Sequence, residues 1–315
     1  MLYVTTRDSR EVYTVHKTML EDLAPDGGAF IPFRIPVLAE EELSSLLQKT
    51  QGEIIAEILN RFFSAKLSGW SVDLAIGRNT FKLANLSQKV IIAEAWRNPG
   101  YNYNYIEDNL YKLLSDSNEI SKTPTSWVRI VIKIACLFVA YAGMIAGNAL
   151  NQDEVFDVSV NVDDFAEPTA VWYAKTMGLP VNKIICATTD NDAIWDLIHR
   201  GQMNTMTISV DLSSGLERLI YNVYGREEAV RFLQIANEKR TYTIDPETEI
   251  FLSDNYFCCV IGKDRATSII NSLSRTDQYA LTPATAVVYG SVQDYRAKTG
   301  ENRTTLLFSG EQPVK

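Results

Sequence analysis

Strand-like and helix-like segments alternate from residue 156 onward, and this alternation constrains the fold more than any other feature of the sequence. Five short segments have the composition of strands, at residues 156–162, 183–187, 206–209, 256–261 and 304–308. Between them lie segments with helical spacing, at residues 168–177, 193–200, 215–224, 227–237, 265–274 and 283–299. Such alternation is typical of a parallel sheet with helical crossovers. We therefore predict an α/β fold with a mostly parallel sheet and helices on both faces.

The first 88 residues follow a different pattern, in which helices dominate. A strand is predicted at residues 2–5, and apolar residues recur at helical spacing within residues 12–23, 39–49 and 52–67. A buried strand at residues 89–95, a helix at 106–114 and a long apolar helix at 127–149 follow. The sequence thus predicts an N-terminal helical lobe over residues 1–88 and a larger α/β region over residues 89–315.

Composition and charge argue against several classes of function. The 30 Lys and Arg residues against 39 Asp and Glu residues give a net charge of -9, which disfavours broad binding to nucleic acid or anionic membranes. The longest uncharged apolar run, residues 134–147, is shorter than the roughly 18 residues of a membrane span. The N-terminus has no signal pattern, so we expect a cytoplasmic protein. Four cysteines without a CxxC pair and two histidines predict no metal site.

Six motifs follow one another along nearly the whole chain: YVTTR at residues 3–7, LAPDGGAFIP at 23–32, YAKTMGLP at 173–180, SSGLERLIYNVYG at 213–225, LTPATAVVYG at 281–290 and SGEQPVK at 309–315. In this order they resemble the motifs of the threonine synthases, a family of fold-type II pyridoxal-phosphate (PLP) enzymes. The resemblance implies a lysine that forms a Schiff base with PLP, a glycine-rich phosphate loop, and a smaller domain that covers the cofactor.

The lysine that the resemblance implies is absent from this sequence. The family's stretch around that lysine aligns with residues 94–105, where Glu94, Trp96 and Pro99 match and Asn104 takes the lysine position. An amide has no nucleophilic amine, and no lysine lies between Lys89 and Lys112. The family's internal Schiff base therefore has no partner at its usual place.

The cofactor-binding segments of the family are also altered. In the phosphate loop, residues 160–167, Phe165 is kept while Asp163 and Ala166 replace the glycines, and Asp164 and Glu167 add carboxylates that repel a phosphate by on the order of 1 kcal/mol each. The same acidic residues suit a helix N-terminus, which is the simpler interpretation of them. In the segments that the family places near the pyridine ring of PLP, Gly310 takes the position of a hydroxyl-bearing residue and Ala284 that of a histidine.

A whole domain of the family is predicted to be missing. Trp127, Arg129 and Ile130 match the helix that follows the smaller α/β domain in the family. In this chain a short polar stretch leads straight to that helix, which places the deletion within about residues 104–126. The sequence thus resembles threonine synthase with its PLP-covering domain deleted.

These losses favour a catalytically inactive pseudoenzyme with a binding, regulatory or scaffolding role, and we expect no bound cofactor. Its partner would be a small metabolite in the remnant cleft or a protein, a second copy of this chain included. A Tyr- and Asn-rich segment, residues 100–105, is a candidate contact surface; alternatively, its tyrosines cover the core that the deletion leaves bare. The candidate cleft consists of Trp96, Asn104, Asp163, Asp164, Glu167, Ala284 and Ser309.

Two alternatives stay open at this point. A divergent enzyme could use the acidic strand-to-helix junction at residues 163–167 to bind a divalent cation or to act as acid and base. A PLP-binding homologue could instead use a relocated lysine, for which Lys112, Lys133 and Lys175 are the candidates nearest in sequence.

Overall fold

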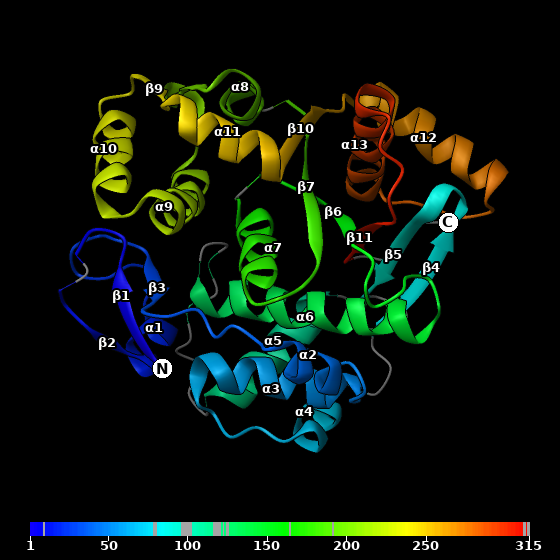
Figure 1. The fold of residues 1–315 in the computed structure, drawn as a ribbon, viewed down its shortest axis with the longest axis horizontal. Helices are drawn as coiled ribbons and strands as arrows, with labels where there is room; N and C mark the ends of the chain where they lie inside the picture. The colour runs from blue at the N-terminus through cyan, green and yellow to red at the C-terminus, as the bar shows by residue number, and fades with distance from the viewer. Residues whose placement is uncertain are drawn as a thin grey trace.

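A six-stranded sheet runs through the centre of the molecule (Figure 1). The computed structural model describes residues 1–8, 10–77, 81–95, 103–115, 121, 123, 126–163, 165–190, 192–310 and 313. The strand order is β10-β7-β6-β11-β5-β4. The strands are β4 (Lys82–Leu86), β5 (Val90–Glu94), β6 (Phe156–Asn161), β7 (Val181–Thr188), β10 (Tyr256–Val260) and β11 (Thr305–Ser309). All neighbours are parallel except β4, which is antiparallel to β5, so the predicted fold class is confirmed.

Helices cover both faces of this sheet because its strands are apolar on both faces. Side chains that follow one another along a strand point to opposite faces, and Leu306 and Leu307 of β11 accordingly belong to two separate apolar clusters. One cluster contains α6 (Trp127–Ala146) and α7 (Ala166–Thr176), and the other contains α12 (Lys263–Thr276) and α13 (Pro283–Thr299). In Figure 1, α7 and α13 lie on opposite sides of β7.

The N-terminal lobe combines a small antiparallel sheet with four helices. The sheet has the order β2-β1-β3, with β1 (Leu2–Thr5), β2 (Tyr13–Thr14) and β3 (Phe30–Pro32). The helices are α1 (Val15–Leu20), α2 (Glu40–Leu46), α3 (Gln51–Phe63) and α4 (Gly69–Ile76). The helix predicted within residues 12–23 is present but shorter: Tyr13 pairs with Tyr3 across the sheet, and the helix that follows has only six residues. Such pairing is non-local and leaves no periodic signal.

Two helices, α5 (Tyr103–Leu114) and α6, follow the first strands of the large sheet. Twelve residues, 115–126, separate them, which is too short a stretch for an α/β domain. The Ser126 hydroxyl caps α6 by accepting a hydrogen bond from the Arg129 N–H at 3.2 Å. By length and composition α6 could cross a membrane, but 78% of its most apolar window is buried inside the molecule. We therefore describe α6 as a core helix.

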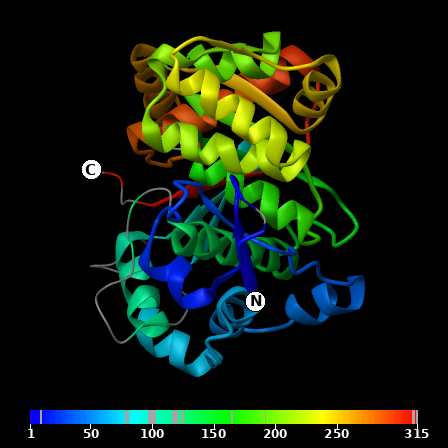
Figure 2. The same ribbon diagram turned by 90° about the vertical axis from the view of Figure 1, so that its left-hand side faces the viewer.

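The remaining elements form a helical layer beside β10. They are α8 (Asp192–Arg200), β8 (Gln202–Asn204), α9 (Val210–Tyr224), α10 (Arg226–Asn237), β9 (Thr241–Thr243) and α11 (Pro246–Asn255), and β8 pairs with β9. The strand predicted at residues 206–209 is wrong, because Thr205–Thr207 forms a short 3-10 turn that directly follows β8. Figure 2 shows the N-terminal segment lying directly against α9 and α10.

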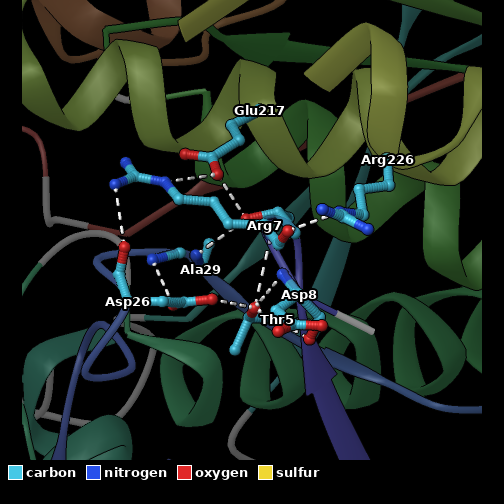
Figure 3. Close-up of polar contacts among 9 residues, drawn as sticks. Thr5, Arg7, Asp8, Asp26, Ala29, Glu217 and Arg226 are labelled. Atoms are coloured by element: carbon cyan, nitrogen blue, oxygen red, sulfur yellow. Dashed lines mark hydrogen bonds and ion pairs between the residues drawn. The ribbon is translucent and has the colours of Figure 1, made fainter. Parts of the chain in front are cut away.

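A polar cluster fastens the N-terminal lobe to α9 (Figure 3). The Thr6 hydroxyl donates to the Glu217 carboxylate and accepts a hydrogen bond from the Ala29 N–H at 2.9 Å. Arg7 Nε lies 3.5 Å from Glu217 Oε1, and Arg226 Nε donates to the Arg7 carbonyl at 2.6 Å. Thr6 is 0% exposed and Glu217 1% exposed. Buried polar groups of this kind need partners, so the lobe and α9 are held in one arrangement.

Candidate functional site

A cavity of about 220 Å³ opens at the carboxyl ends of β5 and β11 and between α5, α6 and α7. In α/β sheets, ligands bind preferentially outside the carboxyl ends of the strands. The cavity is lined by Ala95, Tyr103, Asn104, Arg129, Lys133, Cys136, Leu137, Val160, Glu167, Ala170, Val171, Phe308, Ser309 and Gly310.

The structure brings several sequence-predicted residues to this one cavity and leaves others apart. Asn104, Glu167 and the adjacent pair Ser309 and Gly310 come from three separate parts of the chain and line it together. Phe165 and Ala166 are buried at the junction of β6 and α7, Asp163 is exposed, and Ala284 is exposed at the start of α13; none of these four is among the lining residues. Trp96 and Asp164 lie outside the described residues.

Lys133 on α6 and Glu167 at the start of α7 form an ion pair in the cavity wall. Lys133 Nζ lies 2.9 Å from Glu167 Oε1, and Glu167 Oε2 accepts a hydrogen bond from the Asn161 N–H at 3.3 Å. The Lys133 side chain is 13% exposed and that of Glu167 is 35% exposed. Burial by itself would lower the pKa of Lys133, but the Glu167 carboxylate more than offsets it, and the pKa is raised. Lys133 is therefore a fixed positive charge.

Tyr103 and a second ion pair stand next to Lys133. Lys133 Nζ lies 5.0 Å from the centroid of the Tyr103 ring, a cation–π contact. Burial, with the nearby Glu107, raises the pKa of Tyr103 well above 10, so the phenol stays neutral. Arg129 Nε lies 3.3 Å from Glu107 Oε1. Burial raises the pKa of Glu107 more than Arg129, Lys133 and the Tyr103 hydroxyl together lower it.

The tyrosines of the predicted contact surface are not exposed where the structure describes them. Tyr103 and Tyr105 are half-buried, and Tyr103 lines the cavity, while residues 100–102 lie outside the described residues. The described tyrosines thus follow the alternative interpretation, in which they cover the core. Sequence patterns did not single out Tyr103 or Arg129 as cavity residues, because their placement depends on how α5 packs against α6.

Gly310 lets the start of α5 approach β11 closely. The Gly310 carbonyl accepts a hydrogen bond from the Tyr103 N–H at 3.0 Å, and a Cβ added at Gly310 would lie 3.3 Å from the Tyr103 Cβ. The preceding residue, Ser309, is buried, and its hydroxyl accepts a hydrogen bond from Thr285 Oγ1 at 3.4 Å. Glycine at position 310 is therefore explained by the close approach of Tyr103, independently of any cofactor.

The acidic junction between β6 and α7 is already engaged within the chain. Glu167 is paired with Lys133, and the Asp163 N–H donates to Asn161 Oδ1 at 2.8 Å. Across the described residues, no group of three or more His, Cys, Asp or Glu side chains is placed to hold a metal ion. The carboxylate that lines the cavity is thus part of an ion pair.

Solved structures show which proteins share this fold. A PLP-bound threonine synthase from Brucella melitensis has a TM-score of 0.81 at 17% identity, over 99% of this chain and 89% of that chain. Threonine synthase from yeast has a TM-score of 0.78 at 14% identity, over 99% of this chain and 87% of that chain. The fold is therefore that of the threonine synthases.

Sequence comparison shows a resemblance to the same family. Residues 2–75 match the family described as Threonine synthase N terminus. Threonine synthase-like 1 from Pongo abelii is 28% identical over 198 residues, which make up 58% of this chain and 26% of that protein. Threonine synthase from Pseudomonas aeruginosa is 23% identical over 214 residues, 64% of this chain and 44% of that protein. The resemblance to the threonine synthase family is confirmed, and the match spans about a quarter of the first of these relatives.

Proposed function

We propose that this threonine synthase-like chain is a catalytically inactive binding protein that holds a small molecule non-covalently in the cavity between α5, α6 and α7. The observation that carries the proposal is Asn104, which lines the cavity at the position that the sequence resemblance assigns to the Schiff-base lysine. An amide cannot supply the amine that PLP needs for covalent attachment. The cavity itself, lined by several apolar side chains and a few charged and polar ones, has the character of a small-molecule site.

The residues of the cavity do not fit covalently held PLP. Lys133 is the lysine among the lining residues, and its ion pair with Glu167 keeps its amine protonated, whereas imine formation needs a free amine. Helix N-termini favour phosphate groups, but at the start of α7 the Glu167 carboxylate occupies that position. Two like charges about 4 Å apart repel each other by roughly 1 to 4 kcal/mol near a surface. Both features work against the cofactor.

One specific observation favours a second candidate function, covalent binding of PLP through a relocated lysine. Lys133, one of the candidates for a relocated Schiff-base lysine, lies in the same cavity as Asn104. If Lys133 lost its proton when an aldehyde entered, it would be placed to react with it. The same experiment separates this function from the first.

The experiment is incubation of the full chain with PLP, followed by a visible spectrum, borohydride reduction and mass mapping of modified lysines. We expect no stoichiometric adduct and only scattered labelling of exposed lysines. Lys133→Arg, which cannot form an imine, and Lys112→Arg, at an exposed position on α5, serve as matched variants. A stoichiometric adduct that disappears only in Lys133→Arg would establish the second function, and one at any other single lysine would overturn both.

A further inference from the structure

We infer that the ligand of this cavity is a small monocarboxylate with a compact apolar body, bound as an anion by Lys133 and Tyr103. The inference rests on the proposed non-covalent binding and assigns its ligand class. Three properties of the cavity lead to it: unused hydrogen-bond donors, the balance of charge, and size.

The first property is an excess of hydrogen-bond donors at one wall. A lysine ammonium has three N–H donors, and the hydrogen bond of Lys133 within the described part of the chain goes to Glu167. The Tyr103 hydroxyl is buried beside the Glu107 carboxylate, whose pKa it lowers, but it makes no well-formed hydrogen bond among the described residues. A buried polar group without a partner costs roughly 1 to 3 kcal/mol. A ligand that offers two acceptor oxygens to these two side chains would remove that cost, and a carboxylate has two such oxygens.

The second property is the charge of the groups that line the cavity on α6 and α7, together with Glu107 on α5, which pairs with the lining residue Arg129. Arg129 and Lys133 on α6 are positive, while Glu107 on α5 and Glu167 on α7 are negative. These charges already balance, so a phosphate dianion would bring two uncompensated negative charges. A monoanion brings one, and Glu107, whose pKa burial already raises, can take up a proton to compensate it. The charge balance therefore favours a monocarboxylate over a phosphate ester.

The third property is the size and the apolar lining. An apolar cavity of about 150 Å³ holds benzene, and drug-sized ligands need about 300 Å³ or more. The volume of 220 Å³ lies between these values. Away from the charged groups, the lining is apolar and includes Leu137, Val160, Ala170, Val171 and Phe308. A branched chain of a few carbons suits this space, with its carboxylate at the α5–α6 wall.

The test uses four probes that share one branched body and differ only in the polar head. The probes are 3-methylbutanoate, 3-methylbutanamide, 3-methylbutan-1-amine and 3-methylbutyl phosphate, titrated into the full chain by calorimetry. We expect the carboxylate to bind with 1:1 stoichiometry and a Kd at least tenfold lower than that of any other probe. Tighter binding of the amine or the phosphate would overturn the ligand class while leaving small-molecule binding intact. Binding of none of the four at millimolar concentration would overturn the ligand class and non-covalent binding together.

Three variants assign the binding to the named residues. Lys133→Gln should raise the Kd of 3-methylbutanoate at least tenfold, and Tyr103→Phe, which keeps the ring, should raise it about fivefold. Lys112→Gln makes the same change at an exposed site on α5 and should leave the Kd unaltered. If Lys133→Gln unfolds, Tyr103→Phe and Gly310→Ala, whose methyl group would press on Tyr103, decide the question. An unchanged Kd in Tyr103→Phe and in either of the other cavity variants would refute the assignment.

Discussion

Replacing Thr6 with valine tests whether the polar cluster holds the N-terminal lobe to α9. Valine keeps the shape of threonine and removes one hydroxyl, so the packing at this fully buried position changes little. The hydroxyl has two partners, the Glu217 carboxylate and the Ala29 N–H. Both partners are buried, at 1% and 0% exposure, so water cannot replace the hydroxyl without opening the interface.

The expected magnitude follows from these two partners. Leaving a buried donor or acceptor without a partner costs roughly 1 to 3 kcal/mol. Glu217 keeps Arg7 Nε at 3.5 Å, and it can relieve a further part of its share by taking up a proton, because burial raises its pKa more than Thr6, Arg7 and Arg218 lower it. We therefore expect a loss of about 3 kcal/mol in the free energy of unfolding for the two groups together. With an unfolding entropy of about 2.1 cal/mol/K per residue, this corresponds to a fall in Tm of about 4 °C.

Thr5, the last residue of β1 and the neighbour of Thr6, offers a matched control. Its hydroxyl donates to Asp26 Oδ2 at 2.6 Å and accepts from the Asp8 N–H at 2.8 Å. Asp26 is exposed, so water can take over the lost bond, and Thr5→Val should cost only about 1 kcal/mol. Equilibrium urea unfolding at pH 7 measures both variants. If Thr6→Val lost no more stability than Thr5→Val, the cluster would not hold the lobe as we argue.

Two further predictions concern the cavity wall. Glu167→Gln should lower the free energy of unfolding at pH 8 by about 1 kcal/mol, since the pair is partly exposed and screened. Folding raises the pKa of Lys133. The ion pair therefore makes its full contribution to the free energy of unfolding below the pKa that lysine has in the unfolded chain, and this contribution is lost as the pH rises through the pKa of Lys133 in the folded chain. The free energy of unfolding of the variant, measured in urea, should therefore fall less between pH 8 and 11 than that of the wild type. Equal falls in the two proteins would contradict this prediction. Burial raises the pKa of Cys136 to about 12. We therefore expect its thiol to resist iodoacetamide at pH 8 in the folded chain and to react in urea, with the labelled peptide identified by mass. Rapid labelling of Cys136 in the folded chain would refute this prediction.

The strands and helices with strong local periodicity could be predicted from the sequence. The parallel strands were located to within a few residues, because a strand buried on both faces is a continuous apolar run. The long apolar helix predicted from residue 127 begins at Trp127 in the structure. Strand β4 was missed because its residues are mixed in burial and most of its stabilisation comes from pairing with β5. The sequence also excluded the family's lysine at position 104, since residue identity alone decides that chemistry.

The composition of the cavity could not be predicted in the same way. Lys133 and Glu167 are 34 positions apart, and nothing in either segment indicates that their charges meet. Their ion pair exists because α6 and α7 pack side by side on one face of the sheet, and Tyr103 reaches Lys133 because Gly310 lets α5 begin close to β11. The sequence by itself determined which reactive groups this chain has and lacks, because these are covalent properties of single residues. Only the tertiary structure decided which of those groups share a cavity, because that depends on contacts between segments distant in the chain.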